Sequence, residues 1–326
     1  MPKAVRPDHG LVFVDQNAYK NPQIPLEPLL QALYITKPSF DLNKVQIITD
    51  RNNLRKLFEV VCGEKHRDFE IAVEIVNNTA LFTRLERCTS EVIGGQEFRG
   101  YGHEFEKEFT KYPSSVKGST SHHRIVSYSF GGLNIVVRFE ADGALPPAMD
   151  PTRSSEQILL DLSSLRMEDG LPPTTLAPSD QGPTSASRLA VMKAGEPVPQ
   201  DRILEIKTRA EHRAIGIPEC MSQLWFSDTR NLFIGLHNRG TFRTINKYHV
   251  DEGMNSQWEK QHEKQLGYLV DLLGKIIATA KGSSSRTKVR GVNGKVILQE
   301  WQATDGPAAH LTKLPDDLRA LWNFKA

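Results

Sequence analysis

The sequence has few cysteines, and they lie far apart. Cys62, Cys88 and Cys220 are the only three in 326 residues. Their spacing matches neither a zinc motif nor a disulfide framework, so we interpret them as reduced core residues. Any metal that this chain binds would then be held by oxygen ligands.

Long apolar runs and a strong excess of one charge are also missing. No run approaches the ~20 apolar residues that span a bilayer, and residues 1–8 lack the apolar centre of a signal peptide. We therefore expect a soluble, intracellular protein with no membrane partner. The net charge of +2 leaves nucleic acid open as a partner without requiring it, because binding depends on a local basic surface.

The remaining composition is that of an ordinary globular protein, with 39% hydrophobic and 25% charged residues. Strand signals and helix signals are interspersed along it. Runs of β-branched and aromatic residues flank Asn77-Asn78 and Gly131-Gly132, and each pair of runs predicts a hairpin. A further strand is predicted at 202–208. Amphipathic helices are predicted after Asp50, the expected N-cap, and at 258–280.

Residues 144–199 differ from the rest of the chain, because proline, serine, threonine and acidic residues dominate there. Such a segment buries too little apolar surface to order itself, and we expect a disordered insertion. The acidic motifs described next lie on both sides of it and must meet. We therefore predict a single domain over 1–326, with a loosely ordered tail from about residue 303.

Two short charged motifs close predicted strands. They are Glu140-Ala-Asp142, at the exit of the second hairpin, and Glu205-Ile-Lys207. Residues i and i+2 of a strand lie on the same face, so each motif projects two charged side chains in one direction. Charges on a strand at the centre of a sheet need partners, and the two motifs together indicate a metal-dependent nuclease centre.

The chemistry expected of that centre follows from its residue types. Mg²⁺ prefers oxygen ligands, and a pair of such ions can clamp the attacking and leaving oxygens of a phosphoryl displacement. The candidate ligands are Glu106, Asp142 and Glu205. Lys207 would stabilise charge on the phosphate or orient the attacking water. A lone Glu-x-Lys also arises by chance on surface strands, so this motif alone does not decide the function.

Several segments, in order, resemble the decapping exoribonuclease family, whose members remove incomplete or NAD caps from RNA 5′ ends. The resemblance spans roughly residues 67–301. The segment from Gly100 to Glu106 is similar to the family's Gly-Tyr-x-Phe-Glu motif with two residues inserted, Glu140 and Asp142 to its Glu-x-Asp, and Glu205 to Thr208 to its Glu-x-Lys-Thr.

Further positions extend this resemblance. Gln223 precedes Gly235 by the spacing expected between the family's active-site glutamine and the glycine of its next strand. The resemblance implies catalytic roles for Glu106, Glu140, Asp142, Glu205, Lys207 and Gln223. It implies a substrate-binding role for Arg67, although the spacing to the next strand is one residue short. The main-chain carbonyl of Ile206 would join the acidic side chains as a metal ligand.

The resemblance also implies a fold and an activity. The fold is α+β, with two curved mixed β-sheets flanked by helices and a PD-(D/E)xK nuclease-like core. The activity is hydrolysis at RNA 5′ ends with Mg²⁺ or Mn²⁺, two ions being expected in the site, sometimes followed by 5′-to-3′ degradation. A 5′-to-3′ exoribonuclease is the implied protein partner, and the nucleus, the cytoplasm or both the implied location.

The sequence departs from the family pattern at two places. One is the long insertion after Asp142, and the other is the extra Gly102-His103, which can shift Glu106. The chain also resembles fungal proteins labelled geranylgeranyl pyrophosphate synthetase. Its residues do not support that label, because the only adjacent aspartates, Asp316-Asp317, lie in the tail and lack the Asp-Asp-x-x-Asp pattern.

Two classes of function stay open at this point. The first is a metal-dependent RNA 5′-end hydrolase, and the second is an inactive relative that binds RNA or protein as a scaffold. The presence of every acidic ligand candidate favours the enzyme, because a buried carboxylate cluster without a cation is costly. Among the basic residues that would track phosphates, Arg209 is favoured because it continues the strand face of Glu205 and Lys207.

Overall fold

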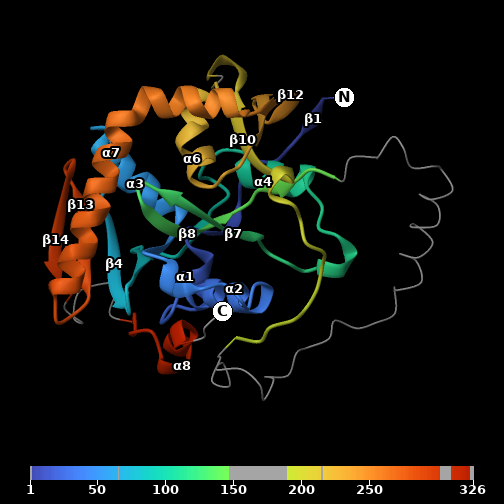
Figure 1. Ribbon diagram of the computed structural model, residues 1–326. Coiled ribbons are helices and arrows are strands. Elements are labelled where there is room, and N and C mark those ends of the chain that lie inside the picture. Colours follow the sequence, from blue (N-terminus) through green and yellow to red (C-terminus); the bar gives the residue numbers. More distant parts are fainter. Residues whose placement is uncertain (1, 65, 147–188, 214–215, 302–309, 324–326) are drawn as a thin grey trace, which may run out of the picture.

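The structure is a computed structural model that describes residues 2–64, 66–146, 189–213, 216–301 and 310–323. Its centre is a seven-stranded sheet beside a five-stranded sheet (Figure 1), and two further strands pair with each other. Each of the two larger sheets contains both parallel and antiparallel neighbours. The predicted α+β class with two curved mixed sheets is therefore confirmed.

The seven-stranded sheet is built around a strand that is buried on both faces. Its order is β14 (Lys295–Glu300), β13 (Thr287–Val292), β4 (Phe69–Val76), β5 (Thr79–Leu85), β3 (Ile47–Asp50), β8 (Leu133–Glu140) and β7 (His123–Phe130). β3 runs parallel to both of its neighbours. Ile47 packs into one core and Ile48 into the other, as the alternation of side chains along a strand requires.

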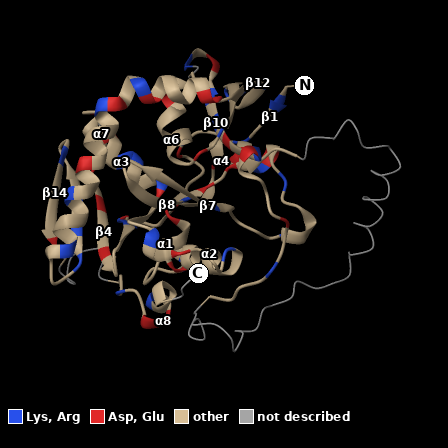
Figure 2. Cartoon of the chain, in the orientation of Figure 1, with Lys and Arg blue, Asp and Glu red and all other residues tan. Residues whose placement is uncertain are grey.

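Helices cover both faces of this sheet. The larger core lies between the sheet, strand β11 (Asn231–Asn238) and three helices, which are α3 (Arg51–Val61), α6 (Met221–Phe226) and α7 (Glu252–Gly282). Along α7, lysines and acidic residues are interspersed (Figure 2), and they lie on the outside of the helix. Leu269, Leu273 and Ile276 of the same helix are fully buried. The opposite face packs on α2 (Glu27–Thr36) and α8 (Asp316–Arg319).

The five-stranded sheet has the order β1 (Lys3–Ala4), β12 (Thr241–His249), β11 (Asn231–Asn238), β10 (Ile203–Ala210) and β9 (Gly143–Ala144). Helix α4 (Gly102–Phe109) packs on it, with the Phe105 and Phe242 ring centroids 4.4 Å apart. This close packing of α4 on the sheet requires a glycine at position 235, because a Cβ there would lie 2.8 Å from atoms of the Phe105 ring.

The remaining elements are short. β2 (Gly10–Phe13) pairs with β6 (Ser90–Ile93), and α1 (Gln16–Lys20) follows β2. The 3-10 turns are Leu42–Lys44, Ser114–Val116, Gln200–Arg202, Glu211–Arg213, Pro218–Cys220 and Ala320–Asn323. Among the helices of the described segments, none combines the length and apolar composition that a membrane span would need.

The predicted hairpins and the predicted N-cap have different outcomes. β4–β5 and β7–β8 are hairpins, and Gly131 and Gly132 at the second turn have φ values of +54° and +82°. Asp50 occupies the N-cap position of α3, but its side chain does not cap the helix. Its carboxylate instead accepts from Arg138 Nε at 2.6 Å and Nη2 at 3.0 Å, because Arg138 is only 2% exposed and needs a counter-ion.

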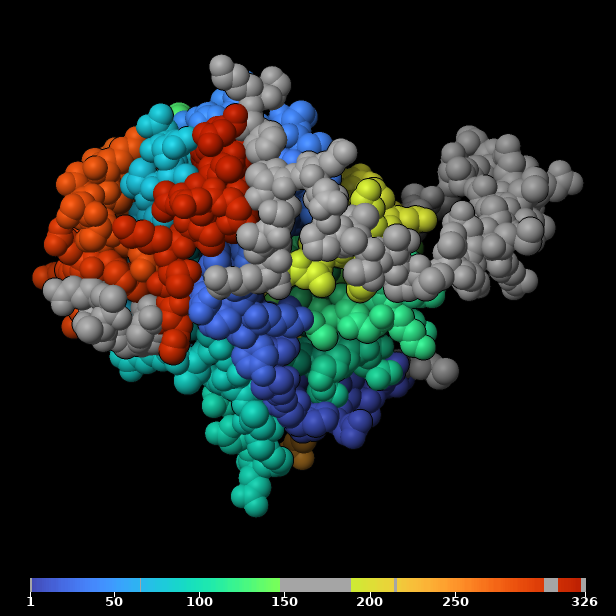
Figure 3. All heavy atoms as spheres, turned by 90° about the horizontal axis from the view of Figure 1, so that it is seen from below, coloured from blue at the N-terminus to red at the C-terminus, as the bar shows by residue number. Residues whose placement is uncertain are grey.

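The C-terminal segment differs from the loose tail expected from the sequence. Leu314, Leu318 and Trp322 are buried, and they pack with α2 on the outer core. In Figure 3 the C-terminal part of the chain, in red, lies against the N-terminal part, in blue. The Trp322 indole donates to Thr79 Oγ1 at 2.8 Å. Their apolar side chains close the sheet face that α2 leaves open. The part of the tail at 302–309, and residues 147–188 of the predicted insertion, lie outside the described residues.

His123 shows how the N-terminal region joins this sheet. Its Nε2 accepts from Asn17 Nδ2 at 3.0 Å, and its Nδ1 lies 3.3 Å from Ser121 Oγ. Burial, together with the nearby charge of Arg138, lowers the pKa of His123 to about 4. The neutral ring is therefore the form that the fold accommodates.

Trp322→Ala should lower the free energy of unfolding by about 3–5 kcal/mol, because it empties a buried site and leaves the Thr79 hydroxyl without its donor. Urea denaturation measures this loss. Tyr268→Ala, at a position that is 51% exposed on α7, serves as the control. An equally small effect of both changes would show that the C-terminal segment does not hold the sheet.

Between pH 6.5 and about 4, stability should fall as the pH falls, because the unfolded chain protonates His123 before the folded protein does. His123→Gln should remove about 3 kcal/mol of that loss, since a shift of one pKa unit corresponds to about 1.4 kcal/mol. Melts across this range test it, with His310→Gln as an exposed control. Equal acid sensitivity of the wild type and His123→Gln would contradict the assignment.

Candidate active site

The two sheets meet where β8 ends and β10 begins. Phe139, Ala141 and Ile203 form a small buried cluster between them. β9 then pairs antiparallel with β10, so that Gly143 faces Leu204. This pairing brings Asp142 to the edge of β10, where its Oδ2 accepts from the Ile206 main-chain N–H at 2.7 Å. The two predicted acidic motifs are therefore adjacent.

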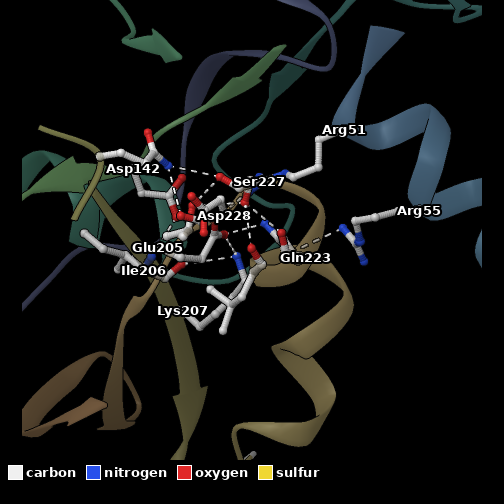
Figure 4. A network of polar contacts seen from close by, with 12 residues as sticks. Arg51, Arg55, Asp142, Glu205, Ile206, Lys207, Gln223, Ser227 and Asp228 are labelled. Carbon is white, nitrogen blue, oxygen red and sulfur yellow. Dashed lines mark hydrogen bonds and ion pairs between the residues drawn. The ribbon is translucent and has the colours of Figure 1, made fainter. Parts of the chain in front are cut away.

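Glu205 is the centre of the polar network in Figure 4. Its side chain is 2% exposed, and its carboxylate accepts from Lys207 Nζ, from Gln223 Nε2 and, at 3.0 Å, from Arg51 Nη1. Burial alone would raise the pKa of Glu205. The charges of Lys207 and Arg51 and the hydrogen bond from Lys207 outweigh it and lower the pKa to about 2.

Lys207 lies on the same strand face as Glu205, as the spacing predicts. Its Nζ also lies 3.3 Å from the main-chain oxygen of Ile206. Burial opposes its charge, but the carboxylates of Glu205 and Asp142 raise the pKa of Lys207 above its usual value. A permanent positive charge therefore stands within the acidic cluster.

The other carboxylates of the cluster resist ionisation. Burial, and then the charge of Glu205, raises the pKa of Asp142 well above its usual value, although Lys207 opposes this. Burial is also the main cause of the raised pKa of Glu106, which is about 7. The charges of Glu140 and Glu205 raise this pKa further, and the charge of Lys207 lowers it. Both carboxyls therefore keep their protons at pH values at which an exposed carboxyl is ionised.

The structure thus brings most of the predicted residues together. Direct contacts link Asp142, Glu205, Ile206, Lys207 and Gln223. Glu106, on α4, and Glu140, at the end of β8, lie within electrostatic range of Glu205.

The two predicted substrate-binding arginines make no contact with this network within the described residues. Arg209 is exposed further along β10, where its Nη1 donates to the Thr208 carbonyl at 2.9 Å. Arg67 is exposed before β4 and lines a separate cavity.

Sequence reasoning missed three residues of this site. Arg51 and Arg55 lie one helical turn apart at the start of α3, and both reach toward the network (Figure 4). Arg55 Nη1 donates to Gln223 Oε1 at 3.3 Å. Ser227, which is fully buried, accepts from Arg51 Nη1 at 3.2 Å and donates to the Gln223 carbonyl at 2.8 Å. Only the i, i+4 spacing of the arginines hinted at a shared face.

The donor set of the site suits a divalent cation that prefers oxygen. Among the described residues, no three His, Cys, Asp or Glu side chains are already gathered as a metal site. The chemistry nevertheless fits, because the raised pKa values of Asp142 and Glu106 come partly from negative charge that a cation would neutralise. The candidate ligands named from the sequence all offer oxygen donors.

Acidic and lysine side chains on adjoining strand ends, between two curved mixed sheets, define a protein with a PD-(D/E)xK-like nuclease fold. A family model described as a domain of unknown function, DUF8563, matches residues 1–320, and the chain belongs to that family. No curated protein matches the sequence.

Solved structures with the same fold include three fungal proteins. Schizosaccharomyces pombe Rai1 is 13% identical, with 93% of this chain and 87% of that chain covered and a TM-score of 0.51. Candida albicans Rai1, in complex with pU5 and Mn²⁺, is 9% identical, with 91% and 80% covered and a TM-score of 0.53. Scheffersomyces stipitis Rai1 is 12% identical, with the same coverage, 91% and 80%, and a TM-score of 0.53. The resemblance to the decapping exoribonuclease family is thus confirmed at the level of the fold.

Arg51→Gln should destabilise the metal-free protein by about 2–4 kcal/mol, because it removes one of the cations that hold a buried carboxylate. When Arg51→Gln is combined with Glu205→Gln, the free energy of unfolding should fall by less than the sum of the two single losses, by a margin of about 1–3 kcal/mol. Denaturation of the four proteins of this cycle in a chelator measures the difference. Arg84→Gln, which has no contact with Glu205 among the described residues, should add to Glu205→Gln without coupling.

Proposed function

We propose that the protein is a metal-dependent hydrolase that acts on the 5′ ends of RNA. The observation that carries the proposal is the convergence of three side chains on β10, where the two sheets meet. Asp142 accepts from the Ile206 main-chain N–H, and Lys207 donates to Glu205. Further support comes from the shared fold of Candida albicans Rai1, which was crystallised with pU5 and Mn²⁺.

The proposed cofactor is a pair of divalent ions, either Mg²⁺ or Mn²⁺. The carboxylates of Glu106, Asp142 and Glu205 and the main-chain carbonyl of Ile206 would hold it. When bound, such ions supply Lewis-acid stabilisation of charge on a phosphoryl group. The calcium ion in the Scheffersomyces stipitis Rai1 complex with (3′-NADP)+ supports divalent-ion binding by proteins of this fold.

The chain's own residues would then orient the substrate and balance its charge. Lys207 keeps a positive charge next to Glu205 and would stabilise the negative charge that grows on the phosphoryl oxygens. Gln223 is held with its oxygen toward Arg55 and its amide nitrogen toward Glu205, so its orientation is set by both partners. Glu140 and Gln223 would position the reacting groups, and Arg209 would bind phosphates at the exit of β10.

The proposed substrates are RNA 5′ ends that carry a triphosphate, an NAD cap or an incomplete guanosine cap, and degradation from 5′ to 3′ can follow. The complex of Schizosaccharomyces pombe Rai1 with 3′-FADP supports a dinucleotide-like group as ligand. A 5′-to-3′ exoribonuclease as partner and a nuclear or cytoplasmic location belong to the same proposal.

One observation favours a second candidate, an inactive scaffold that binds RNA or protein. Glu205 already satisfies its carboxylate with Arg51, Lys207 and Gln223. A carboxylate compensated in this way is held without any cation, so the network can serve the fold alone. The two candidates differ in whether Glu205 matters for turnover.

Glu205→Gln should lower the release of product from 5′-triphosphate, NAD-capped and guanosine-capped RNA by about 10²-fold or more, because it removes the central negative ligand while it preserves shape. Lys207→Ala should slow the chemical step as well, with little change in metal affinity. RNA binding should survive both changes, because separate basic residues hold the phosphates. Single-turnover rates with Mg²⁺ and Mn²⁺ measure these effects.

Glu263→Gln, at an exposed position on α7, is the matched control and should keep wild-type rates. The scaffold candidate predicts a different pattern. The wild type would then bind RNA or a partner but cleave no 5′ end with either metal, and Glu205→Gln would behave identically.

A further inference from the structure

Asp8 is buried beside the start of α4, the helix that carries Glu106. It is only 5% exposed. Its main-chain N–H donates to the Gly100 carbonyl at 2.9 Å, and its Oδ1 accepts from the Glu104 main-chain N–H, also at 2.9 Å. Asp8 therefore binds the chain on both sides of Gly102-His103, the two residues that are inserted relative to the family motif.

Helix α4 has no capping side chain of its own. Tyr101 occupies the N-cap position but makes no side-chain hydrogen bond to the helix, and its ring lies 4.7 Å from the His237 ring between centroids. An N-cap side chain normally accepts from the N–H of the second or third helical residue, and Glu104 is the third residue of α4. Asp8 thus supplies from a distant segment the cap that Tyr101 lacks.

The segment that carries Asp8 is itself held in place. β1 pairs with β12 at the edge of the five-stranded sheet (Figure 1). Val5 N–H donates to the Gly240 carbonyl at 2.9 Å, and Lys3 forms an ion pair with Glu108 in the last turn of α4. Residues 3–8 therefore contact α4 at both of its ends and fix it against the sheet.

The placement of α4 matters because Glu106 has little else to hold it. Among the described residues, no hydrogen bond or ion pair joins the Glu106 carboxylate to another group, although the charges of Lys207 and Glu205 act on it. Glu106 follows the capped N–H of Glu104 by two residues. The start of the helix therefore determines where the Glu106 carboxylate lies relative to the Glu205 network.

We propose that Asp8 is a positioning residue, whose cap fixes α4 so that Glu106 can bind the same divalent cation as Glu205. The inference rests on the proposed function and adds to it a residue outside the family motifs. Asp8 acts through the helix and does not bind the cation. The alternative is that the negative charge of Asp8 attracts the cation from a distance. Asparagine separates the two, because it keeps the capping oxygen and removes the charge.

The test measures Mn²⁺ binding by isothermal titration calorimetry, in the full chain without RNA. Asp8→Ala should weaken binding by at least about 10-fold, the usual effect of removing a group that orients a metal ligand. Asp8→Asn should stay within about threefold of the wild type, because asparagine caps helices as well as aspartate does. In the metal-free protein, hydrogen exchange of the α4 amides should be faster in Asp8→Ala and unchanged in Asp8→Asn.

Asp251→Ala is the matched control. Asp251 is the N-cap of α7 and accepts from the Met254 N–H at 2.8 Å, but α7 carries none of the candidate ligands. Both alanine variants should lower the melting temperature, because each loses a capping carboxylate, and only Asp8→Ala should lose affinity for Mn²⁺. Asp8→Glu keeps the charge but moves the oxygen by one methylene, and it replaces Asp8→Ala if that variant does not fold.

Three results would overturn the proposal. They are wild-type Mn²⁺ affinity in Asp8→Ala, an equal loss of affinity in Asp251→Ala, and a loss in Asp8→Asn as large as that in Asp8→Ala. The last of these would show that the charge of Asp8 matters and the cap does not.

A failure of the proposed function would look different. The wild type would then bind Mn²⁺ but hydrolyse no RNA 5′ end, and the binding measurements would still decide the role of Asp8. A wild type that binds no Mn²⁺ would overturn both proposals.

Discussion

The burial of the Glu205 carboxylate is the constraint on which the rest of the structure depends. A carboxylate that is 2% exposed is tolerated only when cations and hydrogen-bond donors surround it. Its donors come from three different elements, because Arg51 begins α3, Lys207 follows on β10 and Gln223 lies on α6. The two sheets and their helices must therefore assemble around one charge, and the stability of the fold is tied to the geometry of the site.

The same constraint divides the acidic residues into two kinds. Glu205 is held as an anion by its donors, with a pKa of about 2. Asp142 and Glu106 receive less compensation, and burial together with neighbouring carboxylates raises their pKa values. Carboxylates whose pKa values are pushed apart in this way are typical of sites that bind cations or move protons. The raised pKa values of Asp142 and Glu106 are what make the cluster more than a structural ion pair.

Much of this arrangement could be predicted from the sequence, because it depends on local patterns. The strand period placed Glu205 and Lys207 on one face, and Gly131-Gly132 fixed the hairpin that delivers Asp142 to β10. Contacts between residues that lie far apart in the sequence could not be predicted in this way. Asp50 has the sequence context of an N-cap but binds Arg138 from a neighbouring strand, and Arg51 contacts a residue more than 150 positions away. Arg67 was assigned by its distance from a strand, which does not reveal the sheet edge on which it lies.

The central claim is that Asp142 and Glu205 hold a divalent cation next to Lys207. Its most direct test is anomalous X-ray scattering from crystals of the protein soaked in Mn²⁺. The expected result is an anomalous peak within ligand distance of both carboxylates, which disappears in the Glu205→Gln variant. A crystal with Mn²⁺ bound elsewhere or nowhere, and with Glu205 still held only by Arg51, Lys207 and Gln223, would contradict it.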